Sequence, residues 1–366
     1  MIDLKSLRQV SGIQRLHIHR CNHLRNLNEI QKLTELKILR IQHCNSIEEW
    51  KSEEELNKLT CLDLQWCANL EKIPNLTLFP ALQELRVQWC AVLGHLYGLD
   101  ETELLETLDL RACNRLRFIP LGTQAKNLKS LTVAWFKSST TIPHLPNIPS
   151  LEHLDLHSNA ELDRLPNLKG LDKLKKINLS GCVSLSKLDF EPLKALESLD
   201  LSGCDKLEEV DFEGLENLRS LHLGRCTSIH DLQNINSCPK LENLHLSGSI
   251  QLSQIKKLDE LSELRDFYIS DCPKLSSIED LGNLRNLRSL QVYGCSTLKS
   301  LKNAGQLSKL KRLNIGGCRQ LIELPDLNNL NELETLTLSW FQNISQPDFS
   351  KLLSLRYLKL SGHSNL

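Results

Sequence analysis

Apolar residues recur along the chain in a twelve-position pattern, L-x-x-L-x-L-x-x-C-x-x-L, in which L is most often leucine or isoleucine. A clear copy, Leu-Glu-Ser-Leu-Asp-Leu-Ser-Gly-Cys-Asp-Lys-Leu, runs from Leu196 to Leu207. Sixteen copies, each 22 or 23 residues after the last, leave little of the chain outside the frame, which indicates a repeat protein. The copies open at Ile13, Leu36, Leu59, Leu82, Leu105, Leu128, Leu151, Leu174, Leu196, Leu218, Leu241, Leu264, Leu287, Leu310, Leu333 and Leu355.

The alternation inside each copy predicts a short strand. Leu199 and Leu201 are two residues apart and so face one side, while Asp200 and Ser202 face the other. After the ninth position the chain turns and returns through segments that contain prolines. Because proline lacks an N–H group and fixes φ, these segments favour irregular or 3₁₀ backbone over long helices.

A single copy cannot bury its own leucines, so neighbouring copies must stack. The period falls in the 20 to 29 residues of leucine-rich repeats. The pattern therefore predicts an α/β leucine-rich-repeat solenoid, a horseshoe of about 16 repeats with a parallel β-sheet on its concave face. We expect residues 1–12 to be the end of a preceding repeat and residues 13–366 to form one solenoid, open at both ends and cut from a longer protein.

The charge and hydropathy of the sequence exclude some classes of binding partner. Lysine and arginine nearly balance aspartate and glutamate, which leaves a net charge of −1. This balance offers no broad cationic field for nucleic acid or anionic membranes. The sequence also lacks an 18-residue apolar run and a signal-peptide core. We therefore expect no nucleic-acid partner, no membrane association and a cytoplasmic location.

Cysteine is concentrated at the ninth position of the repeat, which holds eleven of the thirteen cysteines. A single column with an odd total predicts free, buried thiols that donate weakly to the backbone, not a disulfide framework. Such thiols indicate a reducing compartment. No C-x-x-C pair supports a zinc site. The eleven are Cys21, Cys44, Cys67, Cys90, Cys113, Cys182, Cys204, Cys226, Cys272, Cys295 and Cys318.

Motifs for chemistry are missing from the sequence. There is no P-loop, no dinucleotide fingerprint, no H-E-x-x-H and no G-x-S-x-G. Histidines on a polar strand face are usually solvated, so we assign no catalytic residue, metal or cofactor. The prediction is a protein without enzymatic activity.

Two features of the early repeats remain as candidates for binding. The fifth position alternates in charge through Arg40, Asp63, Arg86 and Asp109, which predicts either a stabilising ladder of ion pairs or a polar track for a partner. Large residues also occupy the turn that follows the strand. Repeat six departs from the frame, with Phe136 in place of cysteine and a polar loop at 137–146.

Tryptophans occur at the eighth position of four repeats, and those at Trp66 and Trp89 belong to adjacent repeats. They either cover the turn and shield the cysteines or contact a protein, since tryptophan and arginine are enriched in binding hot spots. The predicted protein-binding residues are Arg40, His43, Trp66, Arg86, Trp89, Arg111 and Trp135.

The repeats at Leu196–Leu207 and Leu310–Pro325 resemble those of plant intracellular nucleotide-binding disease-resistance receptors, particularly the type with an N-terminal TIR domain. The resemblance implies a domain that senses pathogen effectors through its inner surface and rim and holds the receptor's own nucleotide-binding domain inactive. It also implies that other domains drive oligomerisation. The nucleotide-binding motifs of that family are absent from this sequence.

Two other classes stay open. One is the substrate-binding half of an F-box ubiquitin ligase, whose repeats resemble these but are longer and contain a true helix. The other is a free-standing leucine-rich scaffold. A P-loop encoded upstream would favour the receptor, and an F-box would favour the ligase.

Overall fold

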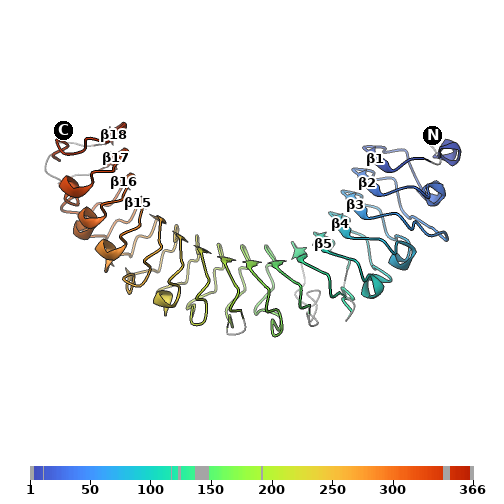
Figure 1. Ribbon diagram of the computed structural model, residues 1–366, viewed down its shortest axis with the longest axis horizontal. Helices are drawn as coiled ribbons and strands as arrows, with labels where there is room; N and C mark the ends of the chain where they lie inside the picture. Colours follow the sequence, from blue (N-terminus) through green and yellow to red (C-terminus); the bar gives the residue numbers. More distant parts are fainter. Residues whose placement is uncertain are drawn as a thin grey trace. The chain divides into compact units, whose positions relative to one another are not determined.

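A computed structural model describes residues 4–10, 12–116, 118–122, 125–136, 148–190, 193–340 and 347–362. The polar loop at 137–146 lies outside these residues. The chain divides into two compact units, Met1–Asn178 and Leu179–Leu366. Each unit is a solenoid of stacked repeats, and Figure 1 shows the strands of successive repeats side by side within it.

The first unit carries eight parallel strands in the described residues, and the order in the sheet is the order in the sequence. Each strand occupies positions three to seven of a predicted repeat, or three to five in the shorter strands. The strands are β1 (Arg15–His19), β2 (Ile38–Gln42), β3 (Cys61–Gln65), β4 (Glu84–Gln88), β5 (Thr107–Arg111), β6 (Ser130–Ala134), β7 (His153–Asp155) and β8 (Lys176–Asn178).

The second unit repeats this arrangement. Its main sheet contains β9 (Ser198–Asp200), β10 (Ser220–His222), β11 (Asn243–His245), β13 (Asp266–Ser270), β15 (Ser289–Tyr293), β16 (Arg312–Gly316), β17 (Thr335–Ser339) and β18 (Tyr357–Ser361). A separate small ladder joins β12 (Gln254–Ile255) to β14 (Ser277–Ile278). The prediction of one strand for each of sixteen repeats is confirmed.

The return segments contain short 3₁₀ helices, as the prolines and irregular spacing predicted. In the first unit these are η1 (Lys5–Gln9), η2 (Asn28–Lys32), η3 (Leu76–Leu78) and η4 (Leu99–Glu101). In the second they are η6 (Ile235–Ser237), η7 (Leu281–Asn283), η8 (Lys302–Gln306) and η9 (Leu327–Asn329). Every helix in the described part of the chain is of this type.

The core of each repeat is the predicted apolar set. In the second repeat, Leu36, Leu39, Ile41, Cys44 and Ile47 are all fully buried. Burying one aliphatic side chain contributes about 1.5–3 kcal/mol before the loss of conformational entropy is subtracted. Since each repeat completes its core against its neighbours, the apolar pattern sets both the strand register and the stacking.

The ninth-position cysteines form the predicted ladder of free thiols. Cys113 is typical: its thiol lies 3.3 Å from the carbonyl oxygen of Val87 in the preceding repeat and 3.6 Å from that of Arg111. Asn159 and Ser249 occupy the same position in their repeats and donate to the equivalent carbonyls, those of Val133 and Leu223. In these repeats the ninth position thus holds a small donor that links one turn to the next, and Phe136 replaces that donor in repeat six.

The eighth position has a backbone conformation that the sequence analysis did not anticipate. In all sixteen repeats this residue has a positive φ; six are glycines and ten are not. In fourteen of these repeats its N–H group donates to the seventh-position carbonyl of the next repeat, as from Trp66 to Gln88 at 2.9 Å and from Gly203 to Gly224 at 2.7 Å. The left-handed turn thus ends each strand while keeping one more inter-repeat hydrogen bond.

Candidate protein-binding surface

The predicted site residues all lie in the first unit, at the solvent-facing strand positions and the turn that follows them. Strands β2 to β5 are in register, so Arg40, Asp63, Arg86 and Asp109 are direct neighbours across the sheet. Two of these four, Asp63 and Asp109, are only 5% and 8% exposed. The surface therefore combines exposed cations with carboxylates set into the sheet.

The predicted ladder of alternating ion pairs is only partly correct. Arg40 Nε lies 3.8 Å from Asp63 Oδ2, across the two strands. Arg86, however, pairs at 2.7 Å with Glu84 of its own strand. A long side chain can reach either the residue two positions along its own strand or its neighbour on the next strand. Arg86 makes the contact within its own strand, with Glu84.

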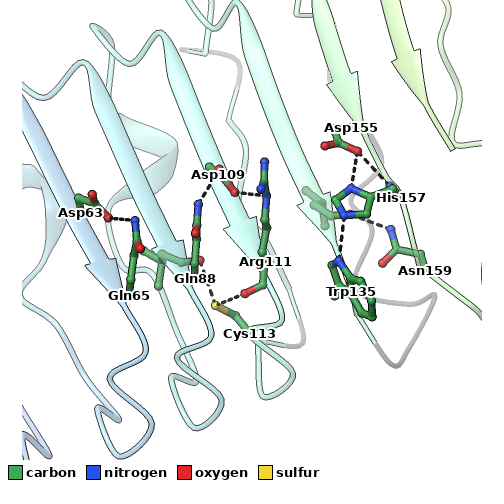
Figure 2. A network of polar contacts seen from close by, with 12 residues as sticks. Asp63, Gln65, Gln88, Asp109, Arg111, Cys113, Trp135, Asp155, His157 and Asn159 are labelled. Atoms are coloured by element: carbon green, nitrogen blue, oxygen red, sulfur yellow. Dashed lines mark hydrogen bonds and ion pairs between the residues drawn. The ribbon is translucent and has the colours of Figure 1, made fainter. Parts of the chain in front are cut away.

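Asp109 is a buried carboxylate of this surface that contacts two polar side chains (Figure 2). Its Oδ2 accepts a hydrogen bond of 2.9 Å from Gln88 Nε2. Its Oδ1 is 3.1 Å from Arg111 Nε, an ion pair whose angle does not make a hydrogen bond. Burial raises the pKa of Asp109, and the Arg111 charge and the Gln88 hydrogen bond offset part of this effect.

The rings at the ends of the strands form a continuous stack, which we call the aromatic row and define as His43, Trp66, Trp89 and Trp135. His43 and Trp66 stack with ring centroids 5.7 Å apart, and Trp66 and Trp89 stack at 4.5 Å with an angle of 3° between planes. Trp89 then reaches Trp135 at 6.1 Å across Ala112, whose small side chain leaves room for both indoles.

The aromatic row is open to solvent. Trp66 is 42% and Trp135 48% exposed, while Trp89 and His43 are half-buried between their neighbours. Indole rings stacked in this way hold one another in place, and their outer faces and edges stay available. The structure thus brings four predicted site residues into one surface, with Arg111 one position before Ala112 and Arg40 and Arg86 on the sheet beside it.

Two residues that fix the end of the row were missed by the sequence analysis. Trp135 Nε1 donates to His157 Nε2 at 2.8 Å, and His157 Nδ1 is 2.7 Å from Asp155 Oδ1 (Figure 2). An indole N–H can only donate, so His157 accepts with Nε2 and donates with Nδ1. The signal lay in the fifth and seventh positions of the repeat that follows Trp135, which carry this Asp and His.

No group of three His, Cys, Asp or Glu side chains in the described residues has a geometry suited to a metal ion. None of the helices among those residues is long and apolar enough to cross a membrane. The arrangement offers ring faces, fixed charges and hydrogen-bonding side chains, which are the means of recognising another macromolecule.

Stacked parallel strands, 3₁₀ returns and the ladder at position nine define a leucine-rich-repeat solenoid, a class that typically serves as a scaffold for protein binding. The chain belongs to the BspA type leucine rich repeat region family, whose model matches residues 147–245 and 224–346 in six copies. This family model names a repeat region and no catalytic activity. No curated protein matches the chain.

Solved structures with a similar fold come from bacteria and plants. A leucine-rich-repeat protein of Leptospira interrogans is 22% identical, with a TM-score of 0.54, 97% of this chain covered and 98% of that one. An internalin, InlF of Listeria monocytogenes, is 16% identical over 96% of this chain and 87% of its own, with a TM-score of 0.47. The plant peptide hormone receptor RGFR1, solved in complex with RGF2, is 14% identical over 98% of this chain and 76% of its own, with a TM-score of 0.49.

Proposed function

We propose that the first unit recognises a partner protein through the aromatic row and the charged side chains beside it. The observation that carries this proposal is the parallel stack of Trp66 on Trp89, with exposed indole surface on an ordered sheet. Pre-stacked rings lose little conformational freedom on binding, so more of their contact energy appears as affinity. Arg40, Arg86 and Arg111 add charge beside the rings.

Within that function, we propose the recognition domain of a plant intracellular immune receptor, acting in the cytoplasm. The style of the repeats supports this identity, and thirteen free thiols suit a reducing compartment. The partner is then a pathogen effector, the receptor's own nucleotide-binding domain, or each in turn. We also propose that residues 13–366 act as one recognition domain and that residues 1–12 end a preceding repeat.

The binding test compares two glycine variants. Glycine suits the left-handed eighth position, so Trp66→Gly/Trp89→Gly removes the indoles without straining the turn. The wild type is first screened by biolayer interferometry against purified pathogen effectors and a nucleotide-binding domain. We expect the double variant to lose more than about 2 kcal/mol of binding free energy towards the partner found.

The matched control is Arg225→Gly, an eighth-position change in the second unit that leaves the aromatic row intact. It should bind as the wild type does. Equal affinity of the double variant and the wild type would refute the role of the row.

The receptor identity has a separate test. The transcript that encodes this chain is sequenced upstream and downstream of residues 1–366. A P-loop and a TIR segment upstream would support the immune receptor. An F-box segment would instead assign the chain to a ubiquitin ligase, and binding through the aromatic row would then concern a substrate protein.

A further inference from the structure

A cleft lies in the second unit, where strands β15 to β17 end. These strands are orange to red in Figure 1. The cleft is open and has a volume of about 460 Å³. Nothing in the proposed function uses it, since the aromatic row belongs to the other unit. Among the residues that the structure describes, its lining consists of glycine backbone, two aromatic rings and one cation: Tyr293, Gly294, Gly317, Arg319, Trp340 and Gly362.

The two rings of this cleft lie over glycines of the following repeats. A Cβ atom at Gly316 would sit 2.9 Å from Tyr293 Cδ2, so the phenol ring covers that glycine. A Cβ atom at Gly362 would overlap the indole of Trp340. Tyr293 is 42% and Trp340 59% exposed, so both rings offer surface to a ligand.

The floor of the cleft is turn backbone, and the Asp271 carboxylate of the preceding repeat lies against it at Gly294. Gly294 and Gly317 are consecutive eighth-position residues with φ of 68° and 65°. A Cβ atom at Gly317 would be 3.3 Å from Gly294 N, which shows how closely the two turns approach. Without side chains at these positions, a ligand can reach the turn backbone between the two aromatic rings.

Three cations and one carboxylate lie near the cleft, and the carboxylate is that of Asp271 in the preceding repeat, whose Oδ1 would be 2.5 Å from a Cβ atom at Gly294. The third, fifth and seventh positions of β15 to β18 include Arg312 and Lys359 and no aspartate or glutamate. Arg312 is held at 3.4 Å by Asp266 of β13. Arg319 is exposed at the edge of the cleft, and in the described part of the chain no carboxylate lies within ion-pair distance of it.

We propose that this cleft binds an acidic, extended segment of a partner protein. An aromatic side chain of the segment lies against Tyr293 and Trp340 above the glycine floor, and a neighbouring aspartate or glutamate pairs with Arg319. Aromatic rings attract one another in offset or edge-to-face geometry, with centroids 4.5–7 Å apart. An arginine fork can take a carboxylate through two parallel hydrogen bonds, which fixes the direction of the segment.

The test uses the peptide acetyl-Asp-Phe-Glu-amide as the probe and the whole chain labelled with 5-fluorotryptophan. Of the five tryptophans, Trp340 should be the one whose fluorine resonance moves, and the buried Trp50 serves as an internal reference. A shift confined to Trp66, Trp89 or Trp135 would overturn the assignment to this cleft, as would the absence of any shift at millimolar peptide.

Affinity is then measured for each variant from the fluorine resonance of a 4-fluorophenylalanine version of the probe. Trp340→Gly suits the positive φ of 61° at this position, and we expect it to weaken binding at least about tenfold. Arg319→Gln removes the charge from an exposed side chain and should weaken binding severalfold. The matched control Arg225→Gly, an eighth-position change outside both the cleft and the aromatic row, should keep wild-type affinity for the probe.

Altered probes decide the chemistry of the ligand. Replacing phenylalanine by alanine, or both acids by lysine, should abolish the binding. A probe with proline in place of phenylalanine that binds as tightly would overturn the aromatic ligand in favour of a polyproline segment. Equal binding of the lysine probe would overturn the role of charge. Because the cleft and the aromatic row are tested with different variants, either proposal can fail alone.

Discussion

At the scale of single residues, the ninth position shows that one structural role can be filled by different chemistry. Cysteine, asparagine and serine are all buried there, and each donates to a carbonyl group of the preceding repeat. Asn159 also accepts a hydrogen bond of 2.9 Å from the backbone N–H of Phe136, where the equivalent contact from the Cys21 N–H to the Cys44 thiol is 3.4 Å. Phe136 is the residue that replaces cysteine in repeat six.

We predict that Asn159→Ala lowers the free energy of unfolding by roughly 2–4 kcal/mol, measured by urea denaturation. The change leaves the Phe136 N–H and the carbonyls of Val133 and Leu156 without their partner, and each buried unpaired group costs about 1–3 kcal/mol. Ser249→Cys is the control and should stay within about 1 kcal/mol of wild type, because cysteine fills this position in other repeats. A cost for Asn159→Ala as small as that of the control would refute the argument.

The raised pKa of Asp109 predicts that the stability of the folded protein depends on pH. Burial raises its pKa in the folded protein above the ordinary value of 3.8, so the folded state holds this proton more tightly than the unfolded state. Between 3.8 and the raised folded pKa, the unfolded state binds fewer protons at this site. The contribution of Asp109 to the stability of the fold therefore falls as pH rises through that window, and the loss persists at neutral pH.

Asp109→Asn removes this titration while keeping an acceptor for Gln88. Thermal unfolding between pH 3 and pH 7 should show the variant gaining stability relative to wild type as pH rises. The comparison between the two proteins cancels the contributions of all other carboxylates. A constant difference across that range would mean that Asp109 does not titrate differently in the two states.

At the scale of the structural element, the left-handed turn after each strand explains why glycine recurs at position eight of the later repeats. The positive φ shows that glycine at position eight is the residue the backbone prefers. Ten repeats carry another residue there, four of them tryptophan, and a non-glycine residue in this conformation costs about 1 kcal/mol.

Gly203→Ala tests this cost cleanly. With φ of 73°, the added Cβ atom would meet only Gly181, at an ordinary 3.6 Å, so backbone strain is the main effect. We predict a loss of about 1 kcal/mol in the free energy of unfolding. The control is Gly94→Ala, where φ is not left-handed and nothing lies within 4 Å of the added atom. It should be neutral or stabilising by up to about 1 kcal/mol, since alanine restricts the unfolded chain. Equal effects at the two sites would contradict the assignment of strain.

At the scale of the whole molecule, the features that could be predicted are those fixed by burial. The leucine period determines the repeats, the strands and the cysteine ladder, because each repeat must cover the apolar face of the next. The positive φ at position eight was not foreseen, although six glycines there carried the signal. Glycine is common in turns of many kinds, so glycine at position eight did not by itself predict a positive φ. The structure shows it because non-glycine residues at this position have the same angle.

Side-chain partners on the surface were predictable only in part. Register placed Arg86 between Asp63 and Asp109, but the side chain pairs with Glu84 on its own strand. Likewise, Trp135 is fixed by a histidine in the turn that follows the next strand. A sequence pattern gives the positions of Cα atoms, whereas flexible side chains choose among several partners of similar energy. The stacking of the aromatic row could have been predicted from the sequence, because adjacent strands hold successive rings about 4.8 Å apart.

The thiol ladder gives a prediction for the entire chain. Twelve of the thirteen cysteines are buried, and Cys21 alone is partly exposed. Burial also raises the pKa of Cys113, Cys226 and Cys238 to about 12, which leaves very little reactive thiolate at pH 8. We therefore expect Ellman's reagent to modify one thiol rapidly in the native protein and all thirteen in guanidinium chloride. Several fast-reacting thiols in the native protein would mean that the ladder opens to solvent.

The left-handed turns also make the chain a template for engineering. Each strand ends in the same backbone shape whatever side chain follows it, so an indole could be removed, or grafted onto a glycine with room for a Cβ atom such as Gly203. Such a graft would cost about as much as a weak hydrogen bond and would leave the leucine core untouched. A family of such chains could acquire new binding surfaces by single-codon changes at a constant spacing.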